Sequence, residues 1–160
     1  MIDRSETEEW ARRFGVRTAQ IRRDHFISHV LHALGQLNPS TRFFGGTALC
    51  RTYLNETRLS EDIDLLHAEP RKLLAALQEA LPKRTRREFP DVTWSPEWAE
   101  GDGLARSLVS PDVDAVKLYV GRDGANTSAW EFAETNIRLR YADLLGSYRS
   151  SVRPFQLSPR

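Results

Sequence analysis

The feature that most constrains this chain is a pair of motifs close together in the sequence, Gly45-Gly46-Thr47 and Asp62-Ile63-Asp64. Phe43 and Phe44 precede the glycine pair and helix-forming residues follow it, so the stretch predicts a strand, a turn and a helix start. The backbone N–H groups at a helix start are unpaired and carry the positive end of the helix dipole, and glycine lets an anion approach them closely. The pattern therefore predicts a phosphate site formed by Gly45, Gly46 and Thr47.

The second motif predicts a metal site. On a strand, Asp62 and Asp64 point to one face, whereas Ile63 and Leu65 point to the other. Two carboxylates this close repel each other, and the pKa of one rises unless a cation lies between them. Hard divalent cations bind carboxylate oxygens together with substrate phosphates. We therefore predict Mg2+, or Mn2+ in its place, bound by Asp62 and Asp64.

Each motif alone is weak evidence. Glycine pairs precede helices in many loops, and alternating acids often mark the solvent face of an edge strand. Their order and spacing, with Arg58 and Ser60 between them, favour a site for nucleotidyl transfer. Arg58 is expected to position a phosphate or to brace the strand, and Ser60 to fix the turn; both complete the predicted nucleotide-binding set.

These residues also carry a resemblance. Gly45 to Leu49 followed by Arg58 to Leu65 resembles the first motif of the AbiEii/AbiGii nucleotidyltransferase-like toxin family, and Ile21 to Leu34 is similar to its lead-in helix. The family has the DNA polymerase β-like nucleotidyltransferase fold. The resemblance implies metal-dependent transfer of a nucleoside monophosphate from a nucleoside triphosphate to an acceptor, which for several such toxins is the 3′ end of tRNA. It also implies a type IV toxin–antitoxin or phage-defence system with a cognate antitoxin.

Length and composition are those of a small globular protein. We expect one nucleotidyltransferase-like domain over residues 1–149, with N-terminal helices at 1–40 and a catalytic core at 41–149, followed by a tail at 150–160. A net charge of +1 gives no overall bias towards nucleic acid, and the single Cys50 excludes an internal disulfide. The sequence contains no apolar stretch long enough to span a membrane, and we predict a cytoplasmic protein.

The periodicity predicts an α+β fold, with a small mixed β-sheet and helices packed mainly on one face. Helices are expected at 5–14, from Thr18 to the breaker at 35–40, at 47–54, and from Glu69-Pro70 to about Leu81. Strands are expected at 41–44, 59–67, 91–94 and 113–120, and residues 97–103 are interpreted as an exposed loop. Residues 136–148 show mixed periodicity.

A third carboxylate is expected, because two-metal transfer uses another acid from a neighbouring strand. Asp112 and Asp114 are the candidates, and we choose Asp114, whose alternative role is to cap the strand start. In the resembled family an acid often follows a Lys-Leu pair on this strand; here Tyr119 follows Lys117 and Leu118. Lys117 is assigned to the catalytic set as a cation for the triphosphate.

The sequence departs from the resembled family in its C-terminal part. The family carries a catalytic lysine and a Lys-Asp motif further on, and residues 141–148 resemble the segment that leads to that lysine. No lysine follows Lys117. Either the triphosphate is bound through Lys117 and arginines, or the chain is a degenerate relative that binds nucleotide or a partner protein without catalysis.

Two further groups remain open. His25, His29 and His32 share one side of the expected long helix; a metal site there would need an added carboxylate or water, and we interpret them as packing or solvent-facing residues. Two basic zones could contact an RNA backbone, donate cations across a homodimer, or simply be solvated. They comprise Lys83 to Arg87 in one zone, and Arg12, Arg13, Arg17, Arg22 and Arg23 in the other.

Overall fold

The computed structural model describes residues 2–37, 41–52, 59 and 61–123. The predicted nucleotide-binding residues Arg58 and Ser60, the segment at 136–148 and the tail at 150–160 lie outside the described residues. Along the chain the elements are α1 (Arg4–Phe14), α2 (Thr18–Leu37), β1 (Arg42–Phe44), α3 (Gly45–Thr52), β2 (Asp62–His67), α4 (Pro70–Thr85), β3 (Thr93–Trp94), β4 (Trp98–Glu100), β5 (Gly103–Ser110) and β6 (Val113–Arg122).

The strands form one mixed sheet in the order β1-β2-β6-β5-β3, with β4 also pairing with β5. All neighbours are antiparallel except β2 and β6, which run parallel. The chain between those two strands includes α4, as a parallel pair requires a long crossover. The structure confirms the predicted α+β class with a mixed sheet.

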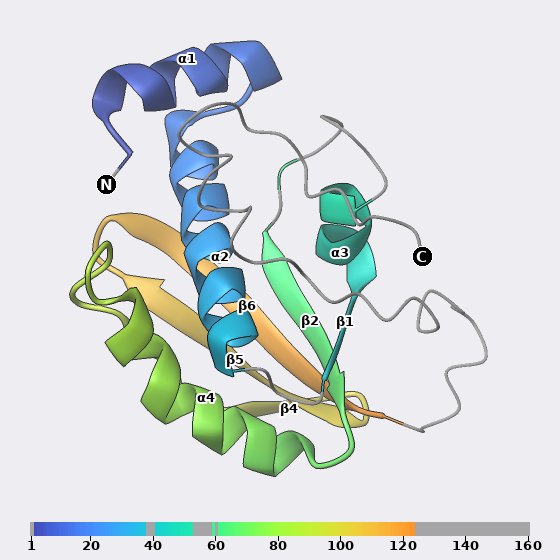
Figure 1. Ribbon diagram of the computed structural model, residues 1–160. Coiled ribbons are helices and arrows are strands. Elements are labelled where there is room, and N and C mark those ends of the chain that lie inside the picture. The colour runs from blue at the N-terminus through green and yellow to red at the C-terminus, as the bar shows by residue number, and fades with distance from the viewer. Residues whose placement is uncertain (1, 38–40, 53–58, 60, 124–160) are drawn as a thin grey trace.

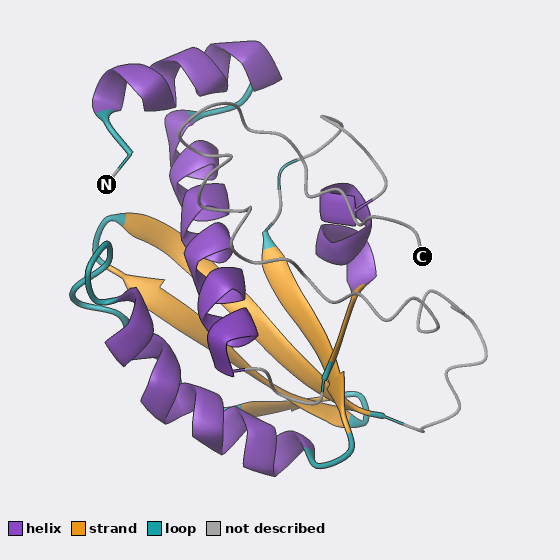
Figure 2. Cartoon of the chain, in the orientation of Figure 1, coloured by secondary structure: helices purple, strands orange, loops and turns teal. Residues whose placement is uncertain are grey.

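Helices α2 and α4 cover the same face of the sheet, and α1 lies across the N-terminal end of α2 (Figure 1). Figure 2 shows this separation of the helical layer from the strands. The core between the layers is formed by apolar side chains from both helices and from the central strands, including Phe26, Leu74, Ile63, Leu65 and Leu118. Ile63 and Leu118 are opposite one another in the β2–β6 register and are fully buried. Apolar burial on this face is therefore what fixes the register of β2 against β6.

Local signals account for most helix ends. Gly15, in the left-handed conformation at φ 65°, ends α1, and Pro70 occupies the first turn of α4, both as expected. The N-cap of α1 is Asp3, two residues before the expected start at residue 5, because the Asp3 carboxylate accepts from the N–H of Glu6 at 2.9 Å. Helix α2 continues past Gly35 to Leu37.

The interpretation of residues 97–103 as an exposed loop was wrong. Strands β4 and β5 form a hairpin there, with Glu100 opposite Gly103 and a two-residue turn at Gly101 and Asp102. Gly101 has φ 59°, a conformation that glycine adopts without steric cost and that tight hairpin turns require. The hairpin places Glu100 and Asp102 beside the central strands.

Helix α3 is attached to α2 by a buried ion pair. The Arg51 guanidinium donates to the Asp24 carboxylate at 2.6 Å and to the Asp24 carbonyl oxygen at 3.1 Å. It also donates to the hydroxyl of Ser28 at 3.0 Å. Arg51 and Asp24 are only 7% and 4% exposed. Because this pair is shielded from water, it holds the helix that follows the glycine pair in a fixed position.

We predict that Asp24→Ala lowers the free energy of unfolding by about 3–5 kcal/mol, because it leaves the Arg51 charge buried without its carboxylate. Urea unfolding followed by circular dichroism measures the change. The control is Lys83→Ala, which removes a solvent-exposed pair with Glu79 and should leave the midpoint unchanged. Equal midpoints for Asp24→Ala and the unmodified protein would contradict the structural role of the pair.

Candidate active site

The two aspartates of the predicted metal site lie on the sheet face opposite the helical layer. Along β2 the apolar residues Ile63 and Leu65 are buried, whereas Asp62 and Asp64 are half-buried on the other face. In the parallel register, Asp62 is opposite Lys117 and Asp64 is opposite Tyr119. Directly opposed residues of paired strands share a face, so these four side chains form one polar surface.

The first turn of α3 lies against this surface. Gly45 has φ 80°, and a Cβ at that position would lie 2.3 Å from Oδ2 of Asp64. The absence of a side chain therefore lets the helix start contact the carboxylate directly. Gly46 has open space around its Cα, with no atom within 4 Å of a built Cβ. The N–H groups of Gly45 and Gly46 belong to the first turn, where a helix offers them no acceptor.

The Thr47 side chain does not face the predicted phosphate site. It is 3% exposed, and its hydroxyl donates to the Asp62 carbonyl oxygen at 2.5 Å. This hydrogen bond joins the start of α3 to the start of β2. The Thr47 side chain therefore positions the two motifs relative to one another, and only its backbone N–H belongs with those of the glycines.

The electrostatics of the aspartate pair favour a bound cation. Burial raises the pKa of Asp64 to about 6, and the negative charge of Asp62 adds to this effect. The ammonium of Lys117 acts in the opposite direction but does not cancel them. A divalent cation would remove both costs, since it supplies positive charge and replaces lost hydration with coordination.

A carboxylate that the sequence analysis missed, Glu100, also faces this site. The Lys117 ammonium donates to Oε1 of Glu100 at 2.9 Å, and this hydrogen bond raises the pKa of Lys117 above its usual range. The charge of Glu100 also contributes to the raised pKa of Asp64. The Gly101-Asp102 turn was the available signal, because a glycine followed by Asp between two alternating segments predicts a hairpin.

The structure does not bring Asp112 and Asp114 to the aspartate pair. Asp112 lies exposed in the β5–β6 turn, and Asp114 is exposed near the start of β6, three residues before Lys117. Three residues along a strand span roughly 10 Å, so Asp114 lies well before the point on β6 that is opposite Asp62. The strand is also irregular here, because the β5–β6 register shifts between Val113 and Val116. Asp114 is therefore poorly placed to join the aspartate pair.

Tyr119 occupies the strand position where the resembled family often has an acid. Its hydroxyl donates to Oδ1 of Asp102 at 3.0 Å, and its ring packs where Gly103 and Gly121 have no side chains. Burial, followed by this hydrogen bond, raises the pKa of Tyr119 to about 12. A phenol that stays protonated is a poor metal ligand, so Tyr119 does not replace the acid chemically.

The family model described as nucleotidyl transferase AbiEii toxin, type IV TA system, matches residues 29–150. This chain belongs to the AbiEii family. The match covers well over half of the chain and includes both motifs, the hairpin that carries Glu100, and β6. The family assignment supports nucleotidyl transfer in general and a toxin–antitoxin context.

Neither the comparison with curated proteins nor the comparison with solved structures gave a match. Among the described residues, no helix combines the length and the apolar character needed to cross a membrane.

We predict that Asp64→Asn stabilises the metal-free protein at neutral pH but not at pH 4. The folded-state pKa of about 6 lies above the unfolded value of 3.8, so the native state binds more protons in between, and wild-type stability falls as pH rises through this window. Asparagine has no such charge. Melting temperatures of both proteins in EDTA should differ increasingly from pH 4 to about 7. A difference that stays constant across this range would contradict the raised pKa.

A matched glycine pair tests the contact between α3 and Asp64. Gly45→Ala should destabilise the protein, because a positive φ costs an alanine about 1–2 kcal/mol and its Cβ would overlap the Asp64 carboxylate. Gly46→Ala should be neutral or stabilising by up to about 1 kcal/mol, because the position is open and alanine favours helix. Urea unfolding of the two variants gives the comparison. Equal effects would show that Asp64 does not contact the helix start.

Proposed function

We propose that this chain is a Mg2+- or Mn2+-dependent nucleotidyltransferase that transfers a nucleoside monophosphate from a nucleoside triphosphate to an RNA acceptor, the 3′ end of tRNA. In this proposal it acts as the toxin of a type IV toxin–antitoxin pair, with a cognate antitoxin as its protein partner. The observation that carries the proposal is the placement of Asp62 and Asp64 on one polar sheet face, against the first turn of α3.

The residues present fit a divalent cation. Asp62 and Asp64 offer oxygen donors from adjacent positions of one strand face, and burial together with the charge of Asp62 raises the pKa of Asp64, a cost that a bound cation would offset. Among the described residues, three carboxylates, those of Asp62, Asp64 and Glu100, act on the Lys117 ammonium, which leaves an excess of two negative charges there when all are ionised. Such an excess favours cation binding.

The protein groups would act mainly by positioning. The amides of Gly45, Gly46 and Thr47 would receive phosphate oxygens at the positive end of α3. When bound, the metal would offset the charge of the transferring phosphate and of the incoming hydroxyl. Arg58 and Ser60 are proposed to complete the nucleotide site from outside the described residues.

We infer that Glu100, rather than the Asp114 chosen from the sequence, is the third carboxylate of the metal site. Glu100 reaches the polar face from the β4–β5 hairpin and is held there by Lys117, whose strand position is opposite Asp62. Lys117 would then have two roles: it orients Glu100 before the substrate binds, and it supplies a fixed cation for the triphosphate.

RNA binding is supported by exposed basic residues rather than by overall charge. Arg12, Arg13, Arg17 and Arg22 are exposed on α1, on the connection that follows it and on α2, and Lys83, Arg84, Arg86 and Arg87 are exposed at the end of α4. Some of these charges have local partners, such as Lys83 with Glu79 and Arg84 with Gln36. Each arginine of the two zones could neutralise one phosphate.

The deciding experiment incubates the protein with each radiolabelled nucleoside triphosphate and total tRNA, with Mg2+ or Mn2+ or with EDTA. Label should enter RNA only with metal. Asp62→Asn and Asp64→Asn should each reduce transfer by at least about 100-fold, because each removes a charge that the metal requires. Circular dichroism and melting temperature check that both variants are folded. Near wild-type transfer by either variant would contradict the proposal.

The same preparation tests the alternative, a relative that binds nucleotide without turnover. Metal and triphosphate that share one site should raise the melting temperature together more than the sum of their separate effects. Cooperative stabilisation with no label transfer to any RNA would favour the binding protein over the enzyme. Strictly additive shifts would count against a shared site in either case.

Glu100→Gln and Asp114→Asn form a matched pair for the third acid, since each replaces a carboxylate by its amide. Glu100→Gln should weaken Mn2+ binding roughly tenfold, measured by electron paramagnetic resonance of free Mn2+, because it removes one negative charge from the polar face. Asp114→Asn should leave the affinity unchanged. The reverse result would restore Asp114 as the third acid.

A further inference from the structure

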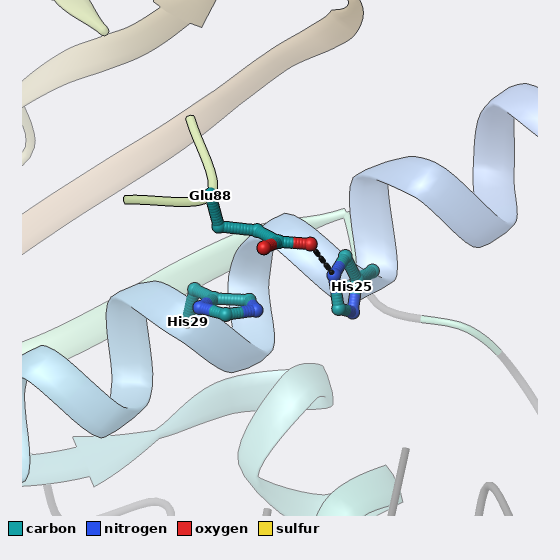
Figure 3. A group of neighbouring side chains, drawn as sticks. All are labelled: His25, His29 and Glu88. Atoms are coloured by element: carbon teal, nitrogen blue, oxygen red, sulfur yellow. Dashed lines mark hydrogen bonds and ion pairs between the residues drawn. The ribbon is translucent and has the colours of Figure 1, made fainter. Parts of the chain in front are cut away.

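A second cluster of metal-binding side chains lies on the helical side of the sheet. His25 and His29 are one turn apart on α2, and Glu88 follows the end of α4, 63 residues from His25 in sequence. One ring nitrogen of each histidine and one carboxylate oxygen of Glu88 lie within 4.8 Å of one another. Figure 3 shows both imidazoles and the Glu88 carboxylate turned towards a common point. The histidine sequence alone lacked a carboxylate for a metal site, and Glu88 supplies one.

The distances suit a small tetrahedral cation. Nε2 of His25 lies 3.1 Å from Oε1 of Glu88. Two ligands bound at about 2.0–2.1 Å in a tetrahedral site lie roughly 3.3 Å apart, so this pair already has nearly the required separation. The His25 and His29 rings have centroids 4.6 Å apart and meet edge to face. The three ligand atoms lie within 4.8 Å of one another, and the His29 side chain is only partly buried.

The cluster is shielded from water. Burial, together with the neighbouring His25, lowers the pKa of His29 to about 4, and burial also lowers the pKa of His25. The Phe89 ring contacts both histidines, with centroids 5.8 Å from His25 and 5.5 Å from His29, and limits water on that side.

We propose that His25, His29 and Glu88 bind a zinc ion that fixes α2 to the segment following α4. Two imidazoles and a carboxylate are a common three-ligand set for zinc, with water as the fourth ligand. Nitrogen donors distinguish this site from the all-oxygen set of Asp62 and Asp64, which suits Mg2+. The ion would join two segments that also pack against each other through Phe26 and Phe89.

The two metal sites are separate. Asp62 and Asp64 lie on the sheet face opposite α2 and α4, and the buried core containing Ile63, Leu65 and Leu118 lies between them and the histidines. The zinc proposal therefore does not depend on nucleotidyl transfer. Either proposal can fail without the other.

The test uses the full untagged chain, stripped of metal with a chelator. Co2+ should give visible absorption bands of a low-coordinate nitrogen and oxygen site, and one equivalent of Zn2+ should abolish them. Saturating Zn2+ should raise the melting temperature by roughly 5 °C or more. The Asp62→Asn/Asp64→Asn double variant should bind Co2+ and Zn2+ as the unmodified chain does, because its substitutions lie on the other face.

His29→Asn and His32→Asn provide the matched comparison. His32 lies one further turn along α2 and hydrogen-bonds to Gln36 rather than joining the cluster. His29→Asn should weaken zinc binding by at least about tenfold and abolish the cobalt bands, whereas His32→Asn should change neither. Glu88→Gln, which can still hydrogen-bond to His25, should also lose the bands. No cobalt bands in the unmodified chain, or equal zinc affinity in both histidine variants, would overturn the proposal.

Discussion

The alternation of side chains along β2 is the constraint on which the rest of the structure depends. β2 lies between β1 and β6, so its backbone is paired on both edges and its register cannot slip without moving Ile63 and Leu65 out of the core. The free energy gained by burying these apolar residues keeps Asp62 and Asp64 on the opposite face. The aspartates are therefore held half-buried and close together at a cost that the raised pKa of Asp64 reports. The free energy gained by burying Ile63 and Leu65 therefore offsets the cost of holding Asp62 and Asp64 half-buried.

The glycine pair depends on a second, smaller set of contacts. β1 pairs with β2 so that Phe44 is opposite Asp64, and α3 starts at the next residue, which places the helix start beside the carboxylate. The Thr47 hydroxyl fixes this start to β2, and Arg51, one turn further on, fixes the helix to Asp24 and Ser28 of α2. Both contacts are buried, so the position of the helix start is determined from within the protein. Preorganisation of this kind is what a site that acts by positioning requires.

The sequence predicted those parts of the fold that local chemistry determines. Gly15 and Pro70 mark helix boundaries, and the apolar stripe of α4 and the alternation of β6 indicate their own burial. What it did not predict depends on pairing between distant segments. Glu100 reaches the polar face only because β4 pairs with β5 and β5 with β6, and Asp114 misses it because it lies roughly 10 Å before Lys117 along β6. The signal for the hairpin was present in Gly101-Asp102, whereas the neighbour of β2 could not be known from local sequence.

Helix α2 contacts the sheet, α3 and the segment after α4, because most of its middle is buried. Phe26, Val30 and Leu34 face the core, Asp24 and Ser28 bind Arg51 of α3, and His25 and His29 meet Glu88 beyond α4. Where the middle of α2 is buried, few substitutions are neutral, and buried polar residues there need hydrogen-bond partners. Asp24 and His25 are adjacent in sequence and point to different partners. The proposed zinc ion would therefore act on the same helix that, through Asp24 and Arg51, holds the helix start beside Asp64.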